Sequence, residues 1–300
     1  MMSYTFIRYY AIKDSIRFIN SNMTYMQNLS NQVLFKYAMF WDIDQYYKIR
    51  SPFKKNPYQI NTKITHHFEC FLKEALHTAY MHASIEEQLF CYYLLISYVV
   101  EEHMTDYVQA FVEKRKRKAY IDHMLETYFF NKNEKIKLHK TNVADYFFDS
   151  FELNLSDINL LEKAIKRQFG FFCTKNYYLE CYRSARFYFD HLARSTTGMK
   201  KPIYFIYDLF FNLRKSKKRA RTYLYPKRLD TTVLNLTKKE FALHDQTVAY
   251  TMDELYQVIL KESRHACDAL NSYFTNNEAI KPLEKFFQKN KKEPSQEIPQ

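Results

Sequence analysis

Side chains that can ligate a metal ion are concentrated between residues 65 and 126. Six of the ten histidines fall there, among several Asp and Glu residues. Side chains three or four residues apart lie on one face of a helix, so the stretch contains the pairs His66 with Glu69, His123 with Glu126, and Asp122 with Glu126. A metal site in a helical bundle takes such groups from several facing helices. The spacing indicates a metal centre, with surface histidines and ion-paired carboxylates as the alternative.

Two basic runs could bind phosphate groups. The first consists of Lys114, Arg115, Lys116, Arg117 and Lys118, and the second contains Arg214, Lys215, Lys217, Lys218, Arg219 and Arg221. Such runs attract nucleic-acid backbones or anionic lipid head groups, and the net charge of +12 also favours an anionic partner. The alternative is that both runs are solvated loops and that the charge reflects compositional drift.

The elements that position these side chains are predicted to be helices. Gly170 and Gly198 are the only glycines, which excludes glycine-rich phosphate loops and argues against β-sandwiches and α/β barrels, whose turns need glycine. We therefore predict an all-α fold, a single multi-helix bundle domain over residues 1–288, followed by a disordered polar tail over 289–300.

Hydrophobic periodicity and capping signals locate the helices. The run from Leu89 to Val100 is apolar on nearly every side and should lie at the centre of the bundle. Ser84 and Thr251 each head a capping box. The segment 214–250 has no sustained period and could form a lid over a cleft. The predicted helices cover residues 6–20, 27–48, 62–82, 84–100 and beyond, 120–131, 156–168, 175–194, 202–213 and 251–275.

The cellular compartment is predicted to be the cytoplasm. The five cysteines are widely spaced without a CxxC pair, which favours buried free thiols in a reducing compartment. The first residues show no signal peptide. The longest apolar stretch has 12 residues, too few to span a bilayer, so no transmembrane segment is expected.

Several strings of the sequence resemble, in order and spacing, bacterial proteins of the zinc-dependent phospholipase C family. They are THHFECFLKEAL, SIEEQLFCYYLLISYVVEEHMTDYV and KAYIDHMLETYFF. The C-terminal strings YLYPKRLDTTVLNLTKKEF and YTMDELYQVILKESRHACDAL resemble the tail of intracellular Firmicutes members. The resemblance covers nearly all of the chain and rests on pattern and order more than on invariant residues.

This resemblance implies an all-α fold that holds a zinc cluster and cleaves a phosphodiester with a metal-activated water. Asp42 is similar to an Asp of the family, His66 or His67 to the ligand that opens the third helix, and Glu126 to the Glu of an H-x3-E motif, with Asp122 in place of its His. The candidate zinc ligands are Asp42, His66, His67, Glu101, His103, Asp122, His123 and Glu126.

The sequence departs from the family at several ligand positions. Where the family's central helix shows H-x3-D followed by another His, this chain has Ser97, Glu101 and Thr105, and His103 is displaced by two residues. A His expected near residues 5 and 6 is absent, and so is a Gly-Pro before Asp42. Either Glu101, His103 and Asp106 form a smaller metal site, or the protein retains the fold and has lost the metal site and its catalytic activity. Two functions follow: a metal-dependent phosphodiesterase acting on a phospholipid-type substrate, or a non-catalytic basic module that binds nucleic acid or an anionic membrane.

Overall fold

The computed structural model describes residues 4–19, 29–47, 56, 58–82, 85–112, 118–148, 155–171, 173–193, 202–203, 206, 224–244, 246–276, 284 and 287. Nearly all regular structure in these residues is helical, and the one sheet among them has two strands. The buried apolar side chains from Tyr4 to Phe287 form a single core cluster. The predicted all-α class is confirmed.

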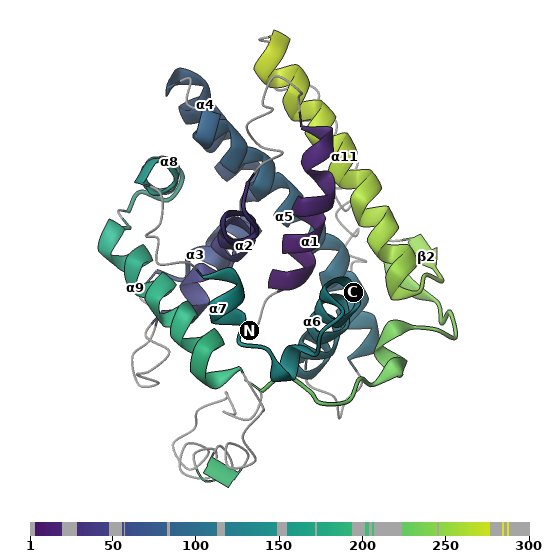
Figure 1. Cartoon of the computed structure of the whole chain (residues 1–300). Coiled ribbons are helices and arrows are strands. Elements are labelled where there is room, and N and C mark those ends of the chain that lie inside the picture. Colours follow the sequence, from purple (N-terminus) through teal and green to yellow (C-terminus); the bar gives the residue numbers. More distant parts are fainter. Residues whose placement is uncertain are drawn as a thin grey trace, which may run out of the picture.

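Helix α1 (Thr5–Ser15) lies in the middle of the bundle (Figure 1). It packs against α2 (Asn31–Phe40), α5 (Ile85–Phe111), α6 (Lys118–Glu134) and α11 (Met252–Asn276). Nine of its eleven residues are buried, and Arg8 is one of them. A polar side chain at one of these buried positions has to find its partners inside the protein.

Among the described residues, α5 is the longest helix, with 27 residues, which corresponds to a length of about 40 Å. Ten of the eleven residues from Leu89 to Val99 are buried, and α5 contacts α1, α4 (Phe68–His82) and α11. The apolar run thus lies in the core, as predicted. Short helix α3 (Ile60–His66) precedes α4.

The remaining helices lie on the side of α1 away from α11 (Figure 1). Helix α8 (Leu155–Phe169) packs on α4, and α9 (Lys175–Phe187) packs on the 3₁₀ turn η3 (Ile43–Tyr46). Helix α9 continues into a π-helical turn, η5 (Tyr188–Leu192), and η5 contacts the short helix α7 (Val143–Phe147). Two further 3₁₀ turns are η1 (Ile16–Phe18) and η4 (Leu138–Lys140).

The C-terminal part contributes a 3₁₀ turn, a hairpin and the long helix α11. The turn η7 (Thr231–Leu234) precedes strands β1 (Phe241–Leu243) and β2 (Gln246–Val248), which pair antiparallel, and β1 packs on α5. Helix α11 begins with the predicted capping box: the N–H of Glu254 donates to Oγ1 of Thr251 at 3.2 Å, and the N–H of Thr251 donates to Glu254 at 2.8 Å.

Several predicted helix boundaries were wrong. The helix predicted over 27–48 begins at Asn31 and ends at Phe40, and the helix predicted over 62–82 is broken at His67, where φ is −128°. The hairpin was not predicted. The predicted helix 202–213 lies almost wholly outside the described residues, as do Ser84 of the first capping box, the basic run 214–221 and the tail 289–300.

Two observations bear on the predicted compartment. Cys91, Cys173, Cys181 and Cys267 are buried free thiols, whereas Cys70 is exposed. Within the described part of the chain, none of the helices combines the length and apolarity needed to cross a membrane. The cytoplasmic location stays a prediction.

Candidate functional site

A fully buried arginine joins two of the predicted metal ligands. Arg8 lies on α1 with 0% of its surface exposed, and Nη1 pairs with Oδ2 of Asp42. Nη2 lies 2.5 Å from Oε2 of Glu101 on α5. The guanidinium also faces the rings of Trp41 and Tyr4, at 5.7 and 6.0 Å from the centroids. One cation is thus enclosed by two carboxylates and two aromatic rings.

Asp42 reaches Arg8 because α2 stops just before it. Asp42 has φ −118° and ψ 11°, outside the helical region. Nε2 of Gln45 donates to Oδ1 of Asp42 at 2.7 Å, so both carboxylate oxygens have donors. The helix predicted to run to residue 48 thus ends at Phe40, two residues before Asp42.

Helix α6 brings two more predicted ligands, Asp122 and Glu126, to the start of α1. The N–H groups of Phe6 and Ile7 donate to the Glu126 carboxylate, with N···O distances of 2.8 to 3.3 Å. The side chain of Tyr4, the N-cap residue of α1, makes no capping hydrogen bond. Glu126 therefore caps α1 from a distant point in the sequence, where a helix N-terminus favours negative charge.

Asp122 is the least satisfied carboxylate of the group. It is 1% exposed, and within the described residues neither of its oxygens accepts a hydrogen bond. The pKa of Asp122 is raised to about 8, chiefly by burial and also by the negative charges of Glu101 and Asp42, while the charge of Lys118 acts in the opposite direction. At neutral pH this carboxyl is therefore mostly protonated.

The pKa values of Arg8, Glu101 and Glu126 are also set by burial on the one hand and by neighbouring charges and hydrogen bonds on the other. Burial acts to lower the pKa of Arg8, but the charges of Asp42 and Glu101 outweigh it and raise that pKa. Burial raises the pKa of Glu101 despite the opposing effect of Arg8, and raises that of Glu126 despite its two backbone donors. We call Arg8, Asp42, Glu101, Asp122 and Glu126 the core acidic cluster.

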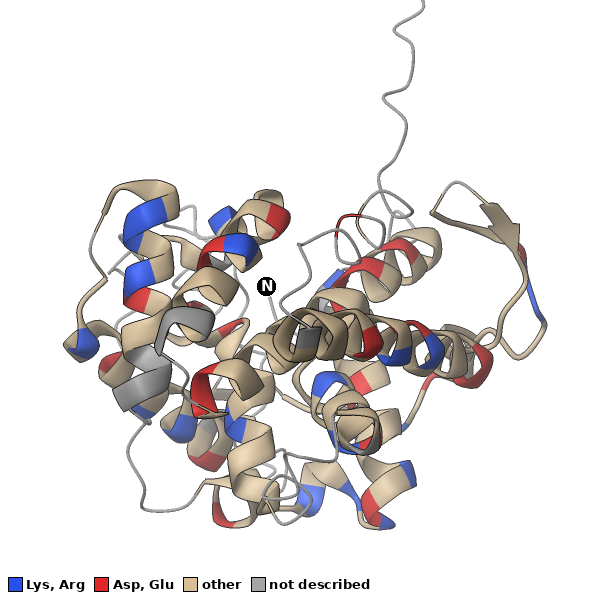
Figure 2. Ribbon diagram, turned by 90° about the horizontal axis from the view of Figure 1, so that it is seen from above, with Lys and Arg blue, Asp and Glu red and all other residues tan. Residues whose placement is uncertain are grey.

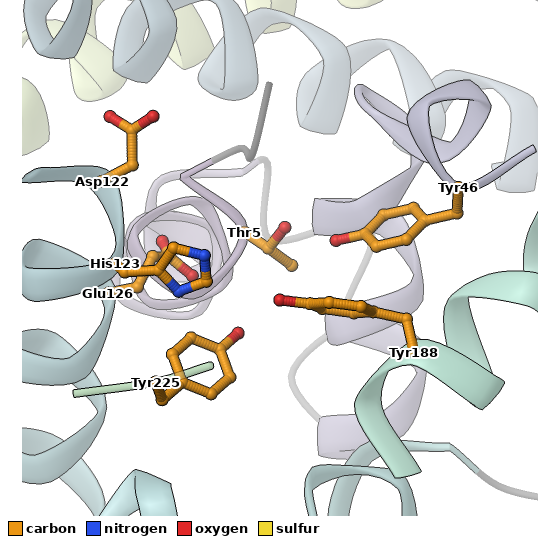
Figure 3. A pocket seen from close by; sticks show the side chains of 7 residues that line it. All are labelled: Thr5, Tyr46, Asp122, His123, Glu126, Tyr188 and Tyr225. Atoms are coloured by element: carbon orange, nitrogen blue, oxygen red, sulfur yellow. The ribbon is translucent and has the colours of Figure 1, made fainter. Parts of the chain in front are cut away.

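A small cavity adjoins this cluster (Figure 3). It has a volume of about 10 Å³, room for roughly one water molecule, and is lined by Thr5, Tyr46, Asp122, His123, Glu126, Tyr188 and Tyr225. Figure 3 shows the hydroxyl ends of Tyr46 and Tyr188 directed toward Thr5, opposite the side chains from α6. All three tyrosines are at most 5% exposed. The cavity is too small for a phosphodiester.

His123 lines this cavity as a neutral residue. It is 5% exposed, and burial lowers its pKa to about 4. Its ring lies edge-on to that of Tyr225, with centroids 5.0 Å apart. His123 therefore adds no positive charge to the core at neutral pH.

Three of the predicted ligands lie elsewhere. His66 and His67 are exposed where α3 meets α4, and the ring of His67 lies 6.1 Å from that of Phe169. His103 is buried on α5 but faces the hairpin, because it lies two residues, or about 200°, around the helix from Glu101. The structure thus brings five of the eight predicted ligands together and separates His66, His67 and His103 from them.

The gathered residues do not fit a zinc ion. Asp42 and Glu101 are engaged by Arg8, and Glu126 is engaged by the start of α1. Zinc in proteins is held mainly by thiolates and imidazoles, and His123 is the one imidazole in this group. Among the described residues, no three His, Cys, Asp or Glu side chains are placed as ready-made ligands of one ion.

Of the predicted anion-binding residues, Lys118 is the one that the structure describes. It opens α6, half-buried, with Nζ 5.9 Å from the centroid of the Tyr4 ring. Its charge lowers the pKa of Glu101 and Asp122 against the effect of burial. Lys114 to Arg117 and Arg214 to Arg221 lie outside the described residues.

The sequence reasoning missed Arg8 and the three cavity tyrosines. Arg8 had a usable signal, since it is a lone cation within the apolar string TFIRYYAI, and an arginine on a buried helix needs carboxylate partners. The tyrosines gave no such signal because tyrosine occurs 27 times in the chain.

Comparisons with family models, curated proteins and solved structures found no match for this chain.

Proposed function

We propose that the protein is a divergent relative of the zinc-dependent phospholipases C that does not hydrolyse phosphodiesters and acts by binding an anionic partner. The proposed relation to this family is supported by four carboxylates that the resemblance aligns with metal-ligand positions of the family: Asp42, Glu101, Asp122 and Glu126. They come from three elements far apart in the sequence and gather at the start of α1.

The main support for the proposal that the protein does not hydrolyse phosphodiesters is the position of Arg8. The guanidinium bonds to Asp42 and Glu101 and supplies positive charge among carboxylates, as a metal ion would. Arg8 follows Thr5 by three residues, on the helix where the family's His is expected. An arginine is always charged and can neither activate a water nor leave an open coordination position.

The packing around the cluster supports the same proposal. Tyr46, Tyr188 and Tyr225 close the space beside Asp122 and Glu126 to about 10 Å³. A phosphodiester substrate would need a cleft of several hundred Å³. The tyrosine rings therefore occupy the region in which a substrate would have to bind.

The net charge supports binding of an anionic partner. The chain carries 45 basic and 33 acidic residues, and an excess of this kind attracts anionic surfaces. Figure 2 shows Lys and Arg interspersed with Asp and Glu on the described helices, so no single basic face is visible there. We assign the binding to the runs 114–118 and 214–221, with an anionic phospholipid surface as the first candidate partner and nucleic acid as the second.

Two assays test this proposal. With zinc added, the protein should not hydrolyse phosphatidylcholine or bis(p-nitrophenyl) phosphate above the blank, whereas zinc-stimulated hydrolysis that disappears in Asp122→Asn would contradict it. The protein should bind phosphatidylserine vesicles more tightly than phosphatidylcholine vesicles. That affinity should fall with salt and on neutralising residues 114–118. Tighter binding to single-stranded nucleic acid than to vesicles would favour the second candidate.

A further inference from the structure

Three exposed lysines from two distant parts of the chain gather beyond the end of α6. Lys137 and Lys140 belong to one turn, because the N–H of Lys140 donates to the carbonyl oxygen of Lys137 at 2.9 Å. Lys227 comes from the segment that leads to η7. The charges of all three act on the imidazole of His139, so the three ammonium groups lie near one side chain. We call Lys137, Lys140 and Lys227 the lysine cluster.

The turn that carries two of these lysines is anchored to the core. Leu138 in η4 is 0% exposed, and its N–H donates to Oδ1 of Asn131 on α6 at 2.7 Å. Lys135 has a φ of 57°, in the left-handed conformation that commonly ends a helix. The exposed side chains of Lys137 and Lys140 therefore extend from a base that is fixed by a buried residue and a hydrogen bond.

His139 lies near the lysine cluster as a neutral residue. It is 7% exposed, and among the described residues its Nδ1 has no hydrogen-bond partner. Its pKa is lowered chiefly by burial and also by the charges of Lys140, Lys137 and Lys227. Every charge that shifts this pKa in the described part of the chain is positive. The lysine cluster therefore creates a positive potential at this end of α6.

The lysine cluster has no acidic partner in the part of the chain that the structure describes, since none of its members pairs with a carboxylate there. Neighbouring ammonium groups repel one another, and a phosphate group that accepts hydrogen bonds from several of them relieves the repulsion. Ile136, which precedes Lys137, is 39% exposed. An exposed apolar side chain among lysines suits the boundary between lipid head groups and acyl chains.

We propose that Lys137, Lys140 and Lys227 bind the phosphate group of an anionic phospholipid, with Ile136 in contact with the bilayer surface. This inference rests on the proposed binding of an anionic phospholipid surface and deepens it, because it places one contact within the described structure. The lysine cluster acts together with the basic runs 114–118 and 214–221.

Co-sedimentation with phosphatidylserine vesicles, compared with phosphatidylcholine vesicles, tests the site. We expect the variant Lys137→Gln, Lys140→Gln, Lys227→Gln to bind phosphatidylserine vesicles about 100-fold more weakly than wild type, which is about fivefold for each lysine near an anionic surface. All three positions are exposed, so the variant should fold as wild type does.

A matched control separates this site from a general effect of charge. The variant Lys163→Gln, Lys166→Gln, Lys261→Gln removes three exposed lysines from α8 and α11. It changes the net charge by the same amount, and it should bind phosphatidylserine vesicles nearly as tightly as wild type.

The imidazole of His139 gives a second readout that a loss of folding would not produce. A bound phosphate offsets the lysine charges, so the pKa of His139 should rise. The NMR signal of this imidazole, identified with His139→Gln, should titrate at higher pH when dihexanoylphosphatidylserine is bound. Glycerol 3-phosphate, which offers the phosphate without acyl chains, should have a smaller effect, and an equal effect would assign the site to free phosphate instead.

The outcomes separate this inference from the proposed function. A lysine-cluster variant that binds as tightly as wild type, or no more weakly than the control variant, would overturn the inference. If binding were lost only on neutralising residues 114–118, the proposed function would stand without the lysine cluster. Wild-type protein that does not bind phosphatidylserine vesicles would contradict both.

Discussion

Arg8 carries a charge that is fully buried, so its carboxylate partners determine whether that charge is stabilised in the core. Removing two charges from water costs several kcal/mol per ion, and close carboxylates offset this loss. Asp42 and Glu101 provide such carboxylates, with Nη2 of Arg8 2.5 Å from Glu101. A substitution that removes either Arg8 or its carboxylate partners leaves the remaining charged side chains without a partner of opposite charge.

Replacing Arg8 with methionine tests this dependence, because the side chains have similar length. We expect Arg8→Met to lower the free energy of unfolding by about 3–5 kcal/mol, since it leaves Asp42 and Glu101 without their cation. Adding Asp42→Asn and Glu101→Gln should restore most of the loss. Urea unfolding measures each value. An Arg8→Met variant as stable as wild type would show that the carboxylates do not need the guanidinium.

Asp122 makes stability depend on pH in a defined direction. Its pKa is about 8 in the folded protein and about 3.9 in an unfolded chain. Between these values the folded protein holds a proton that the unfolded chain releases, so the contribution of Asp122 to stability is most favourable at low pH and becomes less favourable as the pH rises toward 8.

Asp122→Asn, which cannot ionise, should be progressively more stable than wild type as the pH rises. We expect no difference near pH 4 and a gain of the order of a few kcal/mol near pH 8. The matched control is Asp268→Asn, at an exposed position on α11. Unfolding curves across this pH range give the result. A difference between variant and wild type that does not change with pH would contradict the assignment.

At the scale of elements, α1 depends on α6 for its N-terminal cap. Glu126 accepts from Phe6 and Ile7, which are 120 and 119 residues away in the sequence. A glutamine at 126 keeps one acceptor oxygen and replaces the other with a donor. Glu126→Gln should therefore weaken the first turn of α1 by about 1 kcal/mol, the usual value of a lost cap.

Hydrogen exchange at the amides of Phe6 and Ile7 measures this change directly. Both amides should exchange faster in Glu126→Gln than in wild type. Glu134→Gln is the control, because Glu134 lies on α6 and accepts from Tyr10 rather than from the first turn. Equal protection of Phe6 and Ile7 in both variants would mean that Glu126 does not cap α1.

The elements were largely predictable from local patterns, and the errors have physical causes. The buried run of α5 and the Thr251 capping box depend on neighbouring residues, and both were found. Helix α2 ends two residues before Asp42, and the contact of Asp42 with Arg8 joins residues 34 positions apart, which local patterns do not show. The hairpin has strands of three residues, too short for alternation to show.

For the whole molecule, the sequence predicted many of the residues that form the candidate site, but it did not predict that an arginine binds the carboxylates of that site. Spacing and resemblance selected Asp42, Glu101, Asp122, His123 and Glu126, and these residues do converge. They also selected His66 and His67, which are exposed, because residue type alone does not show which way a helix faces. The cation Arg8 was missed because a search for metal ligands does not consider arginine, and the three cavity tyrosines were missed with it.

We propose that Arg8 takes the place of a metal ion in the core acidic cluster. The most direct test is the metal content of the wild-type protein, purified without a histidine tag or chelators. Elemental analysis should find no stoichiometric zinc, and adding zinc should leave its thermal midpoint unchanged. One or more equivalents of zinc, lost on changing Asp122 to Asn, would contradict the claim.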